Sequence, residues 1–154
     1  MTKKSKQKNL LNVCLIGSGV VFGVLTLLLM LAPGIITKIS LLEARFSVYE
    51  LLNYADEFRI GVLLILIFAI VLLAAALLLA VLKLLNKKSK YEKLIAFCAA
   101  VLGIVAGVLL FLVKSLVGLA NSSITSLGIG AILAGVFAIV AALSLGLYAV
   151  KAKK

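Results

Sequence analysis

The chain has 154 residues, of which 65% are hydrophobic and 14% are charged, and its formal net charge is +11. Soluble domains are about 45–50% apolar and about one quarter charged, so this composition excludes an ordinary soluble domain and favours a membrane protein. The positive charge does not predict nucleic-acid binding, because the lysines lie in short segments beside apolar blocks and not on one folded basic face.

Four apolar segments are long enough to cross a bilayer. At 1.5 Å per residue, about 20 helical residues cover the roughly 30 Å hydrocarbon core. The first segment is longer than the apolar part of a cleaved signal peptide, so we expect it to be retained as a span that ends at Pro33-Gly34. We predict an all-α fold, a four-helix transmembrane bundle formed by a single membrane domain over residues 1–154. The predicted spans are about 10–31, 60–82, 94–113 and 127–150.

The basic residues are distributed unevenly between the segments that flank these spans. Twelve of the sixteen lie before the first span, in the loop 83–93 or after the last span. In a four-span protein these three segments share one side of the membrane, and the cytoplasmic side retains the excess of Lys and Arg. We therefore predict a multi-pass protein of the plasma membrane with both termini and loop 83–93 in the cytoplasm.

The predicted outside loop, residues 33–59, holds four of the five acidic residues. Ser47 and Glu50 have the spacing of a capping box, and apolar residues follow at helical spacing. We predict a short amphipathic helix over about 47–57, preceded at 36–46 by one or two short strands. In the second outside loop, 114–126, Asn121-Ser122-Ser123 matches a glycosylation sequon, but we expect a polar turn there. The apolar face of the predicted helix comprises Val48, Leu51, Leu52, Ala55 and Phe58, and its opposite face comprises Glu50, Asn53, Asp56 and Glu57.

The acidic face of that helix is the predicted surface for a partner, and its charge favours a basic one. The alternative is that the helix only covers the bundle or lies in the headgroup layer.

Small residues recur every four positions in three of the predicted spans. Residues four apart lie on one face of a helix, and small faces let helices approach closely in lipid. We expect these faces to pack within one bundle, and the alternative is a face for a second copy or a partner helix. The predicted packing residues are Gly19 and Gly23 in the first span, Ala99, Gly103 and Gly107 in the third, and Gly130, Ala134, Ala138, Ala142 and Gly146 in the fourth.

No constellation of residues predicts a reaction. The chain has no histidine, and none of the four predicted spans contains Asp, Glu, Lys or Arg. Ionisable residues within spans usually mark proton and ion pathways. The hydroxyls within the spans, on Ser18, Thr26 and Ser144, are expected to bond their own backbone. We therefore expect no catalytic, metal or cofactor site, and no enzyme.

Two segments resemble a known group of proteins, Leu41–Leu52 (LLEARFSVYELL) and the region from Ser126 to Gly135 onward. They are similar to uncharacterised small four-span membrane proteins of low-GC Gram-positive bacteria. In that group a small residue tends to follow the loop serine, where this chain has Val48. The resemblance implies a topology and no function. Claudin-type junction proteins share the topology, but their first loop has a tryptophan-containing motif with two cysteines that this chain lacks.

These observations predict a non-enzymatic protein of the bilayer that acts as an interaction or scaffold protein, an accessory subunit or an immunity-type protein. Its expected partners are a membrane protein or a second copy of the chain, with no nucleic acid. The alternative is an oligomeric channel or a transporter of small solutes.

Overall fold

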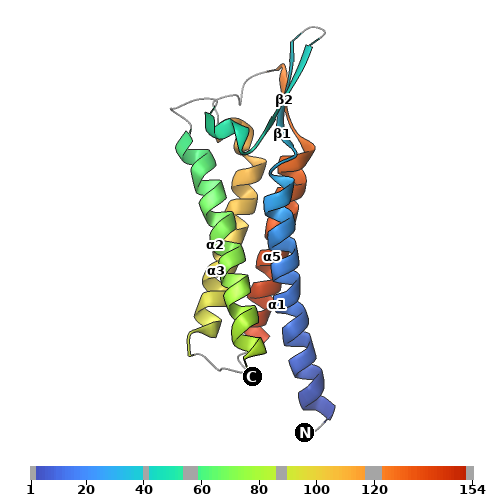
Figure 1. Cartoon of the computed structure of the whole chain (residues 1–154), viewed down its shortest axis with the longest axis vertical. Helices are drawn as coiled ribbons and strands as arrows, with labels where there is room; N and C mark the ends of the chain where they lie inside the picture. The colour runs from blue at the N-terminus through green and yellow to red at the C-terminus, as the bar shows by residue number, and fades with distance from the viewer. Residues whose placement is uncertain (1–2, 40–41, 54–58, 86–89, 117–122, 152–154) are drawn as a thin grey trace.

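The computed structural model describes residues 3–39, 42–53, 59–85, 90–116 and 123–151. Four long helices form a bundle that is capped at one end by a small sheet (Figure 1). The helices are α1 (Lys3–Leu29), α2 (Arg59–Leu84), α3 (Glu92–Phe111) and α5 (Ile129–Lys151). The shorter elements are β1 (Pro33–Ile39), β2 (Leu42–Ser47), η1 (Glu50–Asn53), α4 (Val113–Leu116) and β3 (Thr125–Leu127).

The four predicted spans are confirmed as helices long and apolar enough to cross a membrane, and they are compatible with a multi-pass membrane protein. Their limits differ from the prediction by a few residues. Helix α1 ends at Leu29 because its last turn tightens, with the Ala32 N–H donating to Leu29 O at 3.1 Å, and Pro33 then begins β1. Helix α5 begins at Ile129, two residues later than predicted, because the residues before it form β3.

The long helices form a ring in which each packs against two neighbours. Helix α5 packs against α1 and α3, and α2 packs against the same two helices. The bundle interior consists of two apolar clusters, one beneath the sheet around Met30 and Leu110 and one nearer the opposite end around Ile16 and Leu145. Packed side chains therefore fill the described interior of one chain.

The serine and threonine hydroxyl groups within the spans bond their own helices, as predicted. Ser18 donates to Leu15 O at 2.9 Å, and Thr26 donates to the carbonyl of the residue four positions before it at 2.8 Å. Ser144 does the same in α5 at 2.9 Å. These groups serve the helix backbone and are not assembled into a polar pathway.

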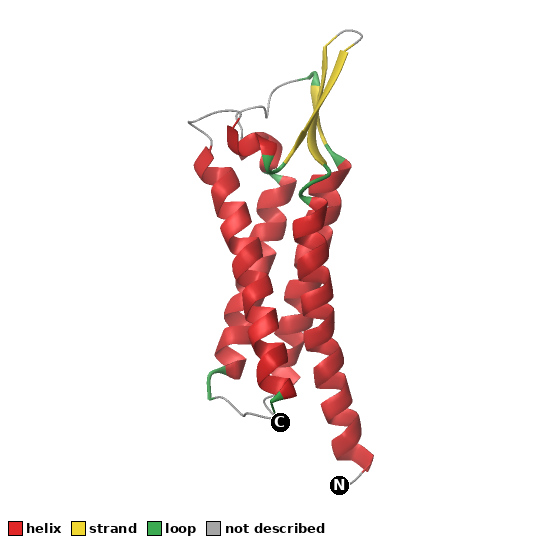
Figure 2. Ribbon diagram, in the orientation of Figure 1, coloured by secondary structure: helices red, strands yellow, loops and turns green. Residues whose placement is uncertain are grey.

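The sheet has the strand order β2-β1-β3, and both pairings are antiparallel (Figure 2). The short strands predicted within 36–46 are confirmed, although they extend over Pro33–Ile39 and Leu42–Ser47. The polar turn predicted at 121–123 is described only at Ser123, which lies in a turn, and the described residues on either side of it form α4 and β3. Three residue pairs join β3 to β1, so the second loop completes a sheet begun in the first.

The predicted amphipathic helix over 47–57 is wrong at its start. Ser47 ends β2, and only the 3-10 turn η1 follows it. The capping box itself is confirmed, because the Ser47 N–H donates to Glu50 Oε2 at 2.7 Å and the Glu50 N–H donates to Ser47 Oγ at 3.2 Å. The Val48 N–H donates to Met30 O at 3.1 Å, which ties this turn to the end of α1. Residues 54–58 lie outside the described part of the chain.

A polar contact joins two helices at the end of the bundle opposite the sheet. Tyr148 in α5 is 1% exposed, and its hydroxyl donates to Glu92 Oε2 in α3 at 3.0 Å. The Lys83 ammonium of α2 lies 5.7 Å from the centre of the tyrosine ring, within cation–π range. Three helices therefore meet at one buried aromatic side chain.

Replacing Tyr148 by phenylalanine removes this hydrogen bond and keeps the ring. Because the acceptor is a carboxylate that is partly exposed, we expect a loss of about 1 kcal/mol in the free energy of unfolding. Thermal unfolding in detergent micelles measures it. Glu92→Gln keeps an acceptor and should lose less, whereas an equal or larger loss in Glu92→Gln would show that the hydrogen bond is not what stabilises this end.

Candidate functional site

The helices offer little that could carry chemistry. Among the described residues, no group of three or more His, Cys, Asp or Glu side chains could hold a metal ion. Cys14 and Cys98 are free and exposed, one in α1 and the other in α3. A hollow in the surface is lined by the side chains of Gln7, Leu10, Leu11 and Cys14 of α1, which bring no acid–base pair together. The sheet-capped end is the more informative surface.

The hairpin of β1 and β2 rises beyond the helices along the long axis of the molecule (Figure 1). Residues Leu42 to Arg45 of β2 are all exposed, and the Leu42 side chain is 79% exposed. Strand β2 is at the edge of the sheet, since the strand order leaves no described neighbour on its outer side. The hairpin therefore presents an open strand edge away from the bundle.

The strand register gives the sheet one apolar face and one polar face. Ile35 is fully buried and Thr125 is 5% exposed on the inner face, which packs on the tops of the helices. Residues directly opposite each other in a sheet share a face. Lys38 lies opposite Glu43, so both belong to the outer face together with Arg45.

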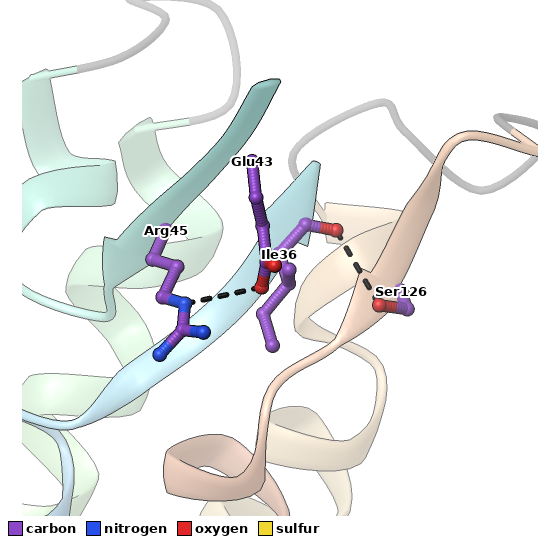
Figure 3. Close-up of polar contacts among 4 residues, drawn as sticks. All are labelled: Ile36, Glu43, Arg45 and Ser126. Carbon is purple, nitrogen blue, oxygen red and sulfur yellow. Dashed lines mark hydrogen bonds and ion pairs between the residues drawn. The ribbon is translucent and has the colours of Figure 1, made fainter. Parts of the chain in front are cut away.

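The charges of the outer face are ordered by a local ion pair. Figure 3 shows Arg45 Nε and Glu43 Oε1 3.1 Å apart on the same strand. On the other side of β1, the Ser126 hydroxyl donates to Ile36 O at 3.4 Å (Figure 3). Both partners of the ion pair remain accessible, and such exposed pairs contribute little to stability, about 0–1 kcal/mol. Their charges remain available to a partner.

The sheet is fixed to the bundle by hydrogen bonds from several elements. The Gly128 N–H donates to Gly34 O at 2.7 Å, and the Lys38 N–H donates to Ile124 O at 2.8 Å. The Tyr49 hydroxyl donates to Leu27 O at 3.1 Å, and burial raises the pKa of this phenol. These bonds anchor the base of the hairpin to the end of the bundle.

Two glycines allow the start of β1 to lie directly on the start of α5. A Cβ atom on Gly128 would contact Pro33 O and would lie 2.6 Å from Pro33 C. On Gly130 it would lie 2.5 Å from Ala32 O. These neighbours are backbone atoms, which cannot move aside as a flexible side chain can, so glycine is required for this approach.

No family model, curated protein or solved structure matches the chain.

The predicted packing residues lie at the places where helices meet. A Cβ on Gly19 would lie 2.9 Å from Leu145 Cδ2 of α5, and one on Gly23 would lie 3.3 Å from Leu73 Cδ1 of α2. Gly130 contacts the segment that leads into β1 and so serves the sheet. Nine of the ten are buried, namely Gly19, Gly23, Ala99, Gly103, Gly107, Gly130, Ala134, Ala138 and Ala142, while Gly146 is half-buried.

The predicted partner surface is only partly described. Glu50 and Asn53 are exposed, whereas Asp56 and Glu57 lie outside the described residues. The Glu50 carboxylate accepts the Ser47 N–H, so it serves the cap of the turn. Sequence reasoning missed the charged outer face of the hairpin. The alternation of apolar and charged residues in Leu42–Phe46, which is typical of a strand, was the available signal.

The cap at Glu50 predicts a pH dependence at the foot of the hairpin. The Ser47 N–H and then the Ser47 hydroxyl stabilise the carboxylate, which lowers the pKa of Glu50 from its ordinary value of 4.5. A lowered pKa contributes stability that is present above 4.5 and is lost as the pH falls through the pKa of the folded protein. We expect the hydrogen-exchange protection of the Ser47 amide to fall in this acidic range. Glu50→Gln should remove that fall, and the same pH profile in Glu50→Gln would contradict the assignment.

Proposed function

We propose that this protein is a non-enzymatic membrane protein that binds another protein through its sheet-capped end. A scaffold, an accessory subunit and an immunity-type protein all act in this way. The observation that supports the proposal most is the hairpin, which extends past the tops of the helices with its outer face charged and its edge open. Closing a four-helix bundle does not require such a projection, so the hairpin supports a role in recognition.

We further propose that the sheet-capped end faces outside the cell and that both termini lie in the cytoplasm. The support is the charge of the chain, since twelve of sixteen basic residues belong to the segments at the other end of the bundle. At the sheet-capped end, four basic residues accompany four acidic ones. This orientation places the hairpin where extracellular or cell-surface proteins can reach it.

Cysteine labelling of intact cells tests this orientation. In a background with Cys14 and Cys98 replaced by serine, Ser123→Cys should react with a membrane-impermeant maleimide. Lys90→Cys should react only after the cells are opened. Both positions are exposed in the structure, so access depends on the side of the membrane. Reaction of Lys90→Cys in intact cells would contradict the orientation.

Affinity capture from native membranes in a mild detergent tests the binding role. Combined replacement of Lys38, Glu43 and Arg45 by alanine should abolish recovery of a specific partner while the protein stays folded. The matched control replaces Lys90, Lys93 and Lys151, three exposed residues at the other end, and should keep the partner. Retention of the partner by the hairpin variant and loss by the control would overturn the proposal.

The alternative function, an oligomeric channel or small-solute transporter, has less support. The buried side chains in the described part of one chain are mainly apolar, so a wet passage would have to form between copies. Solute and ion flux into liposomes that contain the purified protein tests this alternative. Flux that requires the protein would favour it over a binding role.

A further inference from the structure

We propose that the partner of the hairpin is a second copy of this chain, joined head to head by antiparallel pairing of β2 with β2 about Ala44. The inference rests on the proposed function and names the partner of that surface. It starts from the sequence of the open edge, Leu42-Glu43-Ala44-Arg45-Phe46, which is complementary to itself when it is read in opposite directions. A twofold axis through Ala44 relates the two copies, as in a closed homodimer.

The pairing about Ala44 satisfies both faces of the edge strand. On the outer face, Glu43 of each copy lies opposite Arg45 of the other, which makes two pairs of opposite charge. On the inner face, Ala44 lies opposite Ala44, and Leu42 lies opposite Phe46. Cross-strand pairs of opposite charge and of apolar side chains both stabilise an antiparallel sheet. Pairing also covers Leu42, which is 79% exposed in the single chain.

The same charges disfavour the two neighbouring antiparallel registers and the parallel pairing. An antiparallel register centred on Glu43 places two carboxylates side by side, and a register centred on Arg45 places two guanidinium groups side by side. Parallel pairing in register brings together like residues at both positions. Charged side chains on an edge strand usually prevent unwanted pairing, and here their alternating sign favours the register centred on Ala44 over both of its neighbours.

The direction of β2 determines how the two paired molecules are oriented relative to each other. From the hairpin tip, which points away from the helices, β2 runs back toward the bundle (Figure 1). Antiparallel pairing therefore places the two bundles at opposite ends of the joined hairpins. Two copies in one bilayer would meet with their β2 strands parallel, in the arrangement that the charges oppose. The proposed contact consequently joins copies that lie in facing bilayers or in separate micelles.

Cross-linking through Ala44 tests the contact with the full chain. Ala44→Cys, in the background without Cys14 and Cys98, should form a disulfide dimer on mild oxidation in detergent, because opposed Cβ atoms in a sheet lie about 5 Å apart. Thr37→Cys is the control. Thr37 lies opposite Ala44 in β1, so in the dimer two such residues are three strand spacings apart, about 14 Å, and should not cross-link.

Charge reversal identifies the register. Glu43→Arg in the Ala44→Cys chain should abolish the dimer, and the double change Glu43→Arg with Arg45→Glu should restore it, because both intermolecular pairs are then exchanged. Liposomes with outward-facing sheet ends should cluster with the same pattern. Failure of Ala44→Cys to cross-link, or failure of the double change to restore the dimer, would overturn the inference. If affinity capture still recovers a different protein that needs the hairpin, the binding function stands without self-pairing. If it recovers none, both fail.

Discussion

Replacing Gly107 by alanine is expected to separate α3 from α5 and to lower the stability of the whole bundle. A Cβ on Gly107 would lie 2.6 Å from Ile139 Cγ1 and 2.9 Å from Gly135 O, and the second neighbour is backbone. Overpacking of this kind typically costs about 1–3 kcal/mol, and Gly107→Leu should cost more. The α3–α5 contact is the most extensive between helices, and close backbone packing is what holds spans together in lipid.

The midpoint of thermal unfolding in detergent measures the loss for Gly107→Ala. Gly146→Ala is the matched control, because it adds the same methyl group to α5, where the nearest atom, Ala100 Cβ, lies at an ordinary contact distance of 3.5 Å. The control should unfold within about 0.5 kcal/mol of the original protein. Equal effects of the two changes would show that Gly107 is not at a tight helix crossing.

Replacing Gly128 by alanine is the second change with a large expected effect. It should destabilise the sheet more than the helix bundle. The new methyl group would meet Pro33 O, with Pro33 C at 2.6 Å and Gly34 C at 2.9 Å. All three are backbone atoms of β1, so β1 has to move away from the start of α5. The movement breaks the bond from the Gly128 N–H to Gly34 O, which holds the two segments together at 2.7 Å. We expect a loss of about 1–3 kcal/mol in sheet stability.

Hydrogen exchange separates this local effect from loss of the fold. In Gly128→Ala, the amides of Lys38 and Gly128 should lose protection while the amides in the middle of α2 and α3 keep theirs. Gly17→Ala is the control, since a Cβ there has nothing within 4 Å, and it should change neither set. Unchanged protection of Lys38 in Gly128→Ala would show that the sheet does not depend on this close approach.

The helices of this protein could be predicted from sequence because a bilayer imposes one dominant requirement. A span needs about 20 apolar residues, and that signal is local and strong. The ends of the spans were less predictable. The sequence associates Pro33 with the end of the first helix. In the structure Pro33 begins a strand, and α1 ends at Leu29, four residues before it.

The sheet at the end of the bundle shows why local sequence patterns predict only part of this region. Strand β3 has three residues, and its main stabilising partner, β1, is about 90 residues away in the sequence. The sequence of three residues does not predict with which distant strand they pair. The capping box predicts the start of an α-helix. In the structure the same two hydrogen bonds lie at the start of a 3-10 turn, and the Val48 N–H is bonded to the end of α1. Long-range contacts decided both cases.

The surface predicted for a partner illustrates the same limit. The acidic residues around Glu50 stand out in the composition of the loop and are therefore predicted to bind a partner. In the structure, the Glu50 carboxylate instead accepts a hydrogen bond from the Ser47 N–H and caps the turn. The exposed residues of the hairpin edge, Leu42 to Arg45, stand out in the sequence only as a loosely alternating run. Their exposure follows from the pairing of the whole hairpin and its direction away from the helices.

The proposed function of this bundle is recognition of a protein through its hairpin. Its most direct test is a photo-cross-linking residue placed at Leu42 in the full chain and activated in native membranes, with a second chain carrying it at Val108, an exposed position in α3. Recognition through the hairpin predicts a protein adduct from position 42 and only lipid adducts from position 108. Protein adducts from position 108 and none from position 42 would contradict it and would place recognition on the faces of the helices.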